Sequence, residues 1–239
     1  MSSNYPNSNG KKILAVDTSS NVLSVAISSG TDAIYEANLD GIPRHSEYLI
    51  DFIQEGLNRL KIKKNNLDAL LWGLGPGSFT GLRIGLSALK GFQLGLQKKS
   101  LGGSSLDLIA LGSGIVSGEL AVCVDARRER IYTAIYQFKN GAIKKILRDS
   151  LFSFDELIKK LKPGMVITGD ALKAYGSSIK EKMGKEVLSL KPIFWYPRAL
   201  FLIHLYDSKS DWLKPLTLKS MSPQYLRRSE AEEMFRKAK

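Results

Sequence analysis

The sequence predicts an α/β fold of two tandem lobes, each a mixed sheet flanked by helices, within 239 residues. Three observations lead to this prediction. The apolar run ILAVD at 13–17 ends in an acid, and LAVCVD at 120–125 repeats that pattern. Each run is followed by two further strands joined by hairpin turns, and then by alternating helical and strand patterns. The spacing of about 100 residues between the copies indicates internal duplication.

The first lobe is expected over residues 13–113, after a flexible polar tail at 1–12. Three strands come first, because short apolar runs alternate with polar turns. A helix, a strand and two more helices follow, as the apolar spacing changes from period two to period 3.6. The expected strands are 13–17, 22–28, 33–39 and 67–73, and the expected helices are 44–60, 80–97 and 104–113.

The second lobe is expected over 118–239 and repeats this order. Asn140-Gly141 is a strong signal for a two-residue hairpin turn, because both positions accept a positive φ. The expected strands are 120–125, 131–138, 142–147, 164–169 and 186–190, and the expected helices are 153–161, 170–183 and 197–207.

Composition excludes several classes of protein. Hydrophobic residues make up 44% and charged residues 24%, which excludes a disordered chain. Cys123 is the single cysteine and lies in an apolar run, so we expect a core residue and no internal disulfide. His45 and His204 are far apart in sequence, and no metal site is expected. The polar start and the lack of a long apolar run favour a cytoplasmic protein without a membrane span.

The net charge of +12 is unevenly distributed along the chain. Residues 1–117 carry 11 basic and 9 acidic groups, and residues 118–239 carry 24 and 14. The second half therefore holds a net charge of +10. Such a half could attract RNA. The alternative is a solvated lysine-rich surface, which we favour because many of these lysines flank helices and turns.

Two segments of the first lobe could hold a phosphate. Asp17, Thr18 and Ser19 begin a polar turn directly after a strand, where α/β sheets place ligands. The loop with Gly75, Gly77 and Ser78 links a strand to a helix, but it lacks the Gly-Lys-Ser/Thr ending of a P-loop. Both segments also read as tight turns with structural side-chain caps, Ser78 or Thr80 being the cap of the helix.

In the second lobe, Asp125 and Arg127 lie in a charged hairpin turn that could meet a phosphate. Gly169 lies in a strand-to-helix turn that could pass beneath a nucleotide. Taken alone, this turn is better explained as a cap of the following helix by Asp170.

Two helices of the first lobe have unusual surfaces. The apolar residues of helix 44–60 cover an arc of roughly 200°, wider than a one-sided stripe of about 100°. Helix 80–97 carries a strip of small residues at Gly81, Gly85, Ala88 and Gly95. Close approach of another helix, within the chain or from a partner, is the expected reason for that strip.

Together these segments resemble a known family. ILAVDTSSNVLSVAI, RHSEYLIDFIQEGL, LDALLWGLGPGSFTGLRIGLSALKGFQLGL, GGSSLDLIA and VDARRERIY are similar to the bacterial TsaB (YeaZ) family of tRNA threonylcarbamoyladenosine synthesis. The resemblance covers most of residues 13–135. It implies two ribonuclease-H-like lobes of the actin and sugar-kinase class.

The resemblance also implies a non-catalytic partner of TsaD, the subunit that modifies adenosine 37 of tRNAs reading ANN codons. TsaD has a His-x-x-x-His metal motif. At the matching place this chain has Ser105 and Ile109, so the imidazole ligands of an iron or zinc ion are absent. No cofactor is implied, apart from weak ATP or ADP binding at a degenerate cleft.

The family is thought to bind TsaD through its first two helices, forming a heterodimer that assembles with the ATPase TsaE and meets tRNA indirectly. Without TsaD, the same apolar surface implies a homodimer. The interface candidates carried over are Leu49, Ile50, Ile53, Leu57, Leu82, Leu86 and Leu89.

Two other functions stay open. An independent ATPase or phosphotransferase would use Asp17, Asp125 and the Gly75–Gly77 loop around Mg-ATP, although Ser19 stands where actin-like ATPases usually have glycine. A direct tRNA-binding protein would use the basic second half.

Overall fold

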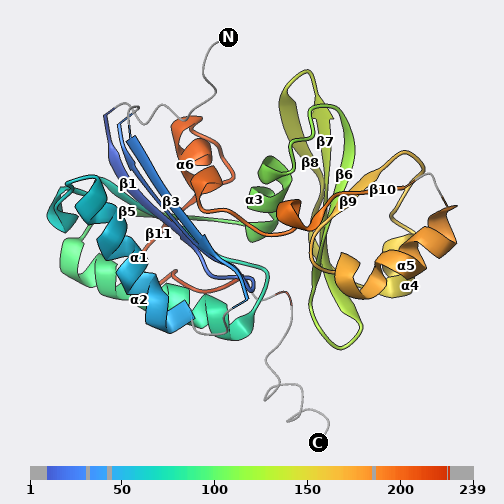
Figure 1. The fold of residues 1–239 in the computed structure, drawn as a ribbon, viewed down its shortest axis with the longest axis horizontal. Coiled ribbons are helices and arrows are strands. Elements are labelled where there is room, and N and C mark those ends of the chain that lie inside the picture. Colours follow the sequence, from blue (N-terminus) through green and yellow to red (C-terminus); the bar gives the residue numbers. More distant parts are fainter. Residues whose placement is uncertain (1–9, 31–32, 42–44, 185–186, 225, 227–239) are drawn as a thin grey trace, which may run out of the picture. The chain divides into compact units, whose positions relative to one another are not determined.

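A computed structural model describes residues 10–30, 33–41, 45–184, 187–224 and 226, and it divides into two compact units. The first unit comprises the chain up to Gly112 together with Tyr196–Pro223. The second unit comprises Ser113–Trp195 together with the chain from Gln224 onward. Figure 1 shows both units. The division near 113 agrees with the sequence, but assigning all of 118–239 to the second lobe was wrong, because 196–223 returns to the first unit.

The first unit is built on a six-stranded mixed sheet with the order β11-β5-β4-β1-β2-β3. β1, β4 and β5 run parallel, whereas β2 is antiparallel to both of its neighbours. The strands are β1 (Lys12–Asp17), β2 (Leu23–Ser29), β3 (Ala33–Leu39), β4 (Ala69–Gly73), β5 (Lys99–Gly103) and β11 (Lys214–Leu216).

Helices cover both faces of this sheet (Figure 1). α1 (His45–Arg59) and α2 (Phe79–Leu96) share one core cluster with Leu14, Val16 and Trp72. α3 (Ser105–Gly112) and α6 (Leu200–Asp207) pack on the opposite face, against alternate residues of the same strands. A single turn of 3-10 helix, η1 (Lys64–Asn66), precedes β4. Because β1 and β4 are buried on both faces, their sequences are continuous apolar runs.

The second unit repeats the topology, with the order β10-β9-β6-β7-β8. β7 is antiparallel to both neighbours, and β6, β9 and β10 are parallel. This repetition confirms the predicted duplication and fold class. The elements are β6 (Gly118–Asp125), β7 (Arg130–Lys139), β8 (Ala142–Ser153), α4 (Phe154–Ile158), β9 (Val166–Thr168), α5 (Leu172–Met183), β10 (Leu188–Ser189) and η3 (Pro192–Phe194).

Local signals placed several elements well. Asn140 and Gly141 have φ values of 51° and 76°, so they form the expected tight turn between β7 and β8. Cys123 is fully buried, and burial raises the pKa of its thiol to about 12. It is therefore the predicted core residue. Among the described residues, no helix combines the length and the apolar character that crossing a membrane requires.

Two strands were missed. β5 contains Gly102 and Gly103, which disfavour a strand by propensity. A Cβ on Gly102 would lie 2.4 Å from a methyl group of Leu74, so close packing determines its glycine. β11 is a short edge strand containing Pro215, a position where proline is tolerated. The remaining elements differ at their ends: β8 extends to Ser153 rather than 147, α4 is shorter than 153–161, and α6 begins at Leu200 rather than 197.

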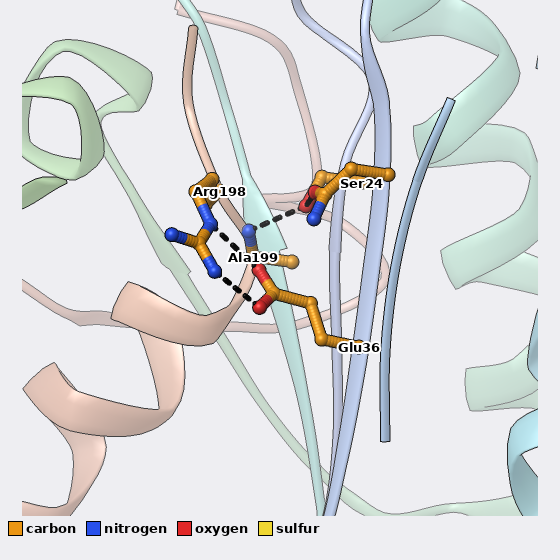
Figure 2. Close-up of polar contacts among 5 residues, drawn as sticks. Ser24, Glu36, Arg198 and Ala199 are labelled. Carbon is orange, nitrogen blue, oxygen red and sulfur yellow. Dashed lines mark hydrogen bonds and ion pairs between the residues drawn. The ribbon is translucent and has the colours of Figure 1, made fainter. Parts of the chain in front are cut away.

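Polar contacts fasten the start of α6 to the first sheet, as Figure 2 shows. The guanidinium of Arg198 donates from two nitrogens to the two carboxylate oxygens of Glu36 on β3. Beside this ion pair, the backbone N–H of Ala199 donates to Ser24 Oγ at 2.8 Å. Ser24 in turn donates to Asn38 Oδ1. The returning segment is thus held by β2 and β3 before it enters α6.

Asp207 ends α6 with both carboxylate oxygens buried and without a hydrogen-bond partner among the described residues. Burial raises the pKa of this carboxyl from 3.8 to about 6. The folded state therefore binds the proton more tightly than the unfolded state does. The contribution of the Asp207 carboxyl to the free energy of unfolding is present below about pH 4 and is lost as the pH rises through about 6.

We expect Asp207→Asn to raise the melting temperature above about pH 6 and to flatten its dependence on pH, because the amide cannot become a buried charge. Melting curves recorded between about pH 4 and pH 8 test this. Asp211→Asn, at an exposed position, is the matched control and should leave the profile unchanged. Equal profiles for Asp207→Asn and the unmodified chain would contradict the assignment.

Candidate functional site

Asp17 lies at the carboxyl end of β1, is fully buried, and has hydrogen bonds to both oxygens. Ser105 Oγ, at the start of α3, donates to Oδ2 at 2.6 Å. Ser19 donates to Oδ1 from its backbone N at 2.8 Å and from its hydroxyl at 2.7 Å. Ser105 Oγ also accepts the backbone N–H of Gly75 at 3.1 Å. One carboxylate thus joins β1, the glycine loop and α3.

Burial raises the pKa of the Asp17 carboxyl, and the hydrogen bonds from Ser105 and Ser19 act against that rise. Those hydrogen bonds stabilise the ionised form of the Asp17 carboxyl within the unit. The network gives Oδ1 two hydrogen bonds and Oδ2 one, all from groups of the same unit. Its chemical effect is to fasten three segments together.

The polar turn and the glycine loop are in direct contact. The backbone N–H of Ser78 donates to the carbonyl of Ser19 at 2.6 Å, and Thr18 Oγ1 donates to the carbonyl of Gly81 at 2.8 Å. A Cβ on Gly77 would lie 2.1 Å from the Ser19 carbonyl oxygen. The structure therefore brings together all the residues predicted for the first-lobe site: Asp17, Thr18, Ser19, Gly75, Gly77 and Ser78. The backbone donors of Ser19, Gly75 and Ser78, which could have held a phosphate, are bonded within the unit.

The small residues of α2 have a different cause from the one expected. A Cβ on Gly81 would lie 2.1 Å from the Thr18 carbonyl oxygen, and one on Gly85 would lie 2.3 Å from Thr18 Oγ1. Gly95 has open space around it. Approach of another helix is thus the wrong explanation for Gly81 and Gly85, which make room for the polar turn. Of the two caps that the sequence offered for α2, Ser78 and Thr80, the structure has Ser78, since its Oγ accepts the Gly81 N–H.

The second unit brings Asp125, Arg127 and Gly169 to the end of β6. Asp125 Oδ1 accepts the backbone N–H of Arg127 at 2.8 Å, and Arg127 Nη1 lies 3.3 Å from Asp125 Oδ2. Gly169 has a φ of 109°, and a Cβ there would lie 2.0 Å from the Cys123 carbonyl oxygen. This glycine therefore allows the chain to pass directly over β6.

Asp170 accepts the backbone N–H of Asp125 at 2.9 Å. α5 starts after Ala171 and has no side-chain cap, so the expected capping of this helix by Asp170 was wrong. Burial raises the pKa of the Asp170 carboxyl, and the charge of Asp125 adds to that rise. The side chain ties the turn after β9 to the end of β6.

The two positions that correspond to the histidines of the TsaD motif hold no metal ligands. Ser105 is engaged by Asp17 and Gly75, and Ile109 is a buried hydrocarbon. Within the described part of the chain, no three His, Cys, Asp or Glu side chains gather in a way that could hold a metal ion. The residues present therefore do not fit an iron or zinc ion bound in the manner of TsaD.

The interface candidates on α1 and α2 need correction. Ile50 has an exposed side chain, at 53%, but the other six are at most 4% exposed and belong to the core of the first unit: Leu49, Ile53, Leu57, Leu82, Leu86 and Leu89. The wide apolar arc of α1 includes half-buried side chains at the border of the core, such as Tyr48 and Phe52, whose rings lie beside each other. The helical wheel could not separate these from residues facing the sheet.

We define the α1–α2 surface by the apolar side chains of these helices that remain exposed or half-buried. Leu94, at 66% exposed, joins Ile50 as a strongly exposed member, and the sequence analysis missed it. The surface comprises Tyr48, Ile50, Phe52, Phe79, Ile84, Ala88, Phe92, Leu94 and Leu96.

Two units that share the order of five strands, each with an acid at the end of its first strand, define the actin-like fold. The fold matches YeaZ from Pseudomonas aeruginosa with a TM-score of 0.74 at 21% identity, over 90% of this chain and 100% of that one. A model of the family described as TsaD, tRNA N6-adenosine threonylcarbamoyltransferase, matches residues 39–194.

Curated relatives carry the name TsaB. The tRNA threonylcarbamoyladenosine biosynthesis protein TsaB of Bacillus subtilis (strain 168) is 28% identical over 228 residues, covering 92% of this chain and 96% of that protein. The protein of the same name from Escherichia coli (strain K12) is 35% identical over 135 residues, covering 55% of this chain and 58% of that protein. The chain belongs to the family of the matching model, in its TsaB (YeaZ) branch.

We expect Ser105→Ala to lower the free energy of unfolding by about 1–3 kcal/mol, because Asp17 Oδ2 then loses its donor while buried. The effect should be larger at neutral than at acidic pH, since an unsatisfied carboxylate favours protonation. Urea unfolding measures both effects. Ser87→Ala, on the exposed side of α2, is the control. Equal stability of the two variants would show that the network is unimportant.

Gly81→Ala and Gly91→Ala form a matched pair within α2. The first should destabilise the unit by roughly 1–3 kcal/mol, because its Cβ meets the Thr18 carbonyl. The second should stabilise it by about 0.8–1.0 kcal/mol, because Gly91 has open space and alanine favours a helix. Thermal melts distinguish the signs. A stabilising Gly81→Ala would refute the close approach of Thr18.

Proposed function

We propose that this chain is a non-catalytic subunit in the N6-threonylcarbamoylation of adenosine 37 in tRNAs reading ANN codons. It binds the catalytic subunit TsaD, stabilises it, and joins TsaE in a larger complex. Its membership in the TsaB branch supports a role in tRNA modification, as do the names of the relatives from Bacillus subtilis and Escherichia coli.

The closure of the Asp17 site by the chain's own groups carries the proposal. In an actin-like ATPase this turn would have to leave room for phosphates and a magnesium ion. Here the Ser19 carbonyl accepts the Ser78 N–H, and the Asp17 oxygens are bonded to Ser19 and Ser105. A phosphate could enter only after several buried hydrogen bonds had broken. This geometry argues against ATP chemistry at the first unit and for a structural role.

The chemistry at positions 105 and 109 gives independent support. A hydroxyl that is already bonded and a buried isoleucine cannot replace two imidazole ligands. We therefore assign the threonylcarbamoyl transfer to TsaD and no cofactor to this chain.

The α1–α2 surface is the proposed docking site for TsaD. Its members are apolar and lie on two helices that share one core cluster, so the surface is rigidly supported. Ile50 and Leu94 are exposed in the isolated chain and would be buried by a partner. In the absence of TsaD, a second copy of this chain is the proposed occupant.

Size-exclusion chromatography of the chain mixed with TsaD tests this docking. We expect Ile50→Asp to weaken the affinity for TsaD at least tenfold, because docking would bury an unpaired charge. The loss of affinity should appear as loss of co-elution. Ile53→Asp is unsuitable, since Ile53 is buried in the core and its substitution would disturb folding. The matched control is Ile193→Asp in the second unit, which places the same charge at a side chain that is 78% exposed.

The control should co-elute with TsaD as the unmodified chain does. Full co-elution of Ile50→Asp would overturn the α1–α2 surface as the docking site. ATP turnover by the purified chain alone, abolished by Asp17→Asn, would overturn the non-catalytic assignment and favour the ATPase alternative.

A further inference from the structure

Lysines collect where the parallel strands of the first sheet begin. Ile13 of β1 lies opposite Ala69 of β4, and Ala69 lies opposite Lys99 of β5, so the three strands start along one edge. The Asp68 N–H donates to the Lys12 carbonyl, which joins the segment after α1 to the same edge. We define the lysine edge as Lys11, Lys12, Lys61, Lys63, Lys64, Lys98 and Lys99.

Two of these lysines converge on one aromatic ring. Lys11 Nζ lies 5.5 Å and Lys99 Nζ 5.6 Å from the centroid of the Tyr206 ring, and Lys11 donates a hydrogen bond to the tyrosine hydroxyl at 3.3 Å. Lys11 precedes β1 and Lys99 begins β5, two strands away, which is roughly 10 Å across a sheet. Both side chains therefore place an ammonium group beside the same tyrosine ring.

Within the part of the chain that the structure describes, no acid neutralises this pair. Among the described residues, neither Lys11 nor Lys99 forms an ion pair with a carboxylate. Asp68 accepts the backbone N–H of Lys12, and the oxygens of Asp207 are buried without a partner. Residues 10–12, 60–68 and 97–99 together contain seven lysines and one acid, Asp68.

Helix polarity explains only part of this arrangement. α1 and α2 end near the edge, and lysines after a helix end are stabilised by the helix dipole. That accounts for Lys61 and Lys98. It does not account for Lys11, which enters a strand, or for the meeting of Lys11 and Lys99 over Tyr206.

We propose that the lysine edge binds the phosphodiester backbone of an RNA, with one phosphate held by Lys11 and Lys99 beside the Tyr206 hydroxyl. Two ammonium groups and a hydroxyl supply donors from several sides, and a phosphate neutralises the repulsion between the lysines. The other lysines extend the positive surface along the sheet edge, as a backbone-tracking surface requires. The choice of RNA as the polyanion rests on the proposed function in tRNA modification.

The experiment measures binding of a labelled tRNA transcript by fluorescence anisotropy over a series of salt concentrations. It uses the full chain, alone and in complex with TsaD. The test variant is Lys11→Glu with Lys99→Glu, since reversing both charges prevents a new ion pair between them. One control, Lys90→Glu with Lys214→Glu, makes the same charge change at exposed positions of the same unit outside the edge. A second, Lys159→Glu with Lys160→Glu, tests the basic second half.

We expect the Lys11/Lys99 variant to bind tRNA at least tenfold more weakly and with a shallower salt dependence. The slope should fall by roughly 0.7–0.9 for each phosphate that the variant no longer neutralises. Both controls should stay within about threefold of the unmodified chain. All variants should still co-elute with TsaD, so failure of RNA binding is distinguishable from failure of the docking proposal.

Equally weakened binding in all three variants would show that net charge alone drives binding and would overturn the site. A larger effect in the Lys159/Lys160 control would assign RNA binding to the second unit instead. No measurable tRNA binding by the unmodified chain at low salt, alone or with TsaD, would also overturn the proposal. Melting curves of each variant ensure that weaker binding is not caused by unfolding.

Discussion

The buried carboxylate of Asp17 is the interaction on which the first unit depends. A charge removed from water is tolerated only when hydrogen bonds replace its hydration, and Ser19 and Ser105 supply them. These bonds bring the end of β1, the glycine loop and the start of α3 to one point. The same closeness requires glycine at positions 77, 81 and 85, where any side chain would meet the polar turn. The polar turn thus joins three segments of the first unit.

The two units use the same topology with different solutions at the corresponding strand end. In the second unit, Asp125 is bonded to the backbone of its own turn and to Arg127, and Asp170 takes the role of tying the next strand to the first. A duplicated strand order therefore does not impose a duplicated site. Buried apolar strands maintain the shared topology in both units, while the polar residues that follow these strands differ between the units.

Repeated patterns made the fold predictable from sequence. The runs ending in Asp17 and Asp125, and the Asn140-Gly141 turn, are local signals, and they placed the strands and the duplication correctly. Tertiary packing decided the rest. Gly102 lies in a strand through its pairing with β4 and β11, and a side chain there would meet Leu74, which no propensity indicates. The site residues were gathered as predicted, but the hydroxyl of Ser105 as donor to Asp17 has no signature in sequence. Burial on α1 and α2 likewise depends on which neighbours cover each helix, so Leu49 and Ile50, adjacent in sequence, have opposite surroundings.

The path of the chain has a consequence for biosynthesis. The chain leaves the first unit after Gly112 and returns at Tyr196, so α6 and β11 reach the ribosome's exit only after the whole intervening unit has been made. Until then one face of the nascent first sheet, including Ile13 and Leu71, is covered by α3 but still lacks α6. The strands and helices of the inserted unit are all made by Trp195, whereas the first unit still lacks α6 and β11 at that point. Synthesis from the N-terminus therefore favours folding of the second unit before the first unit is complete.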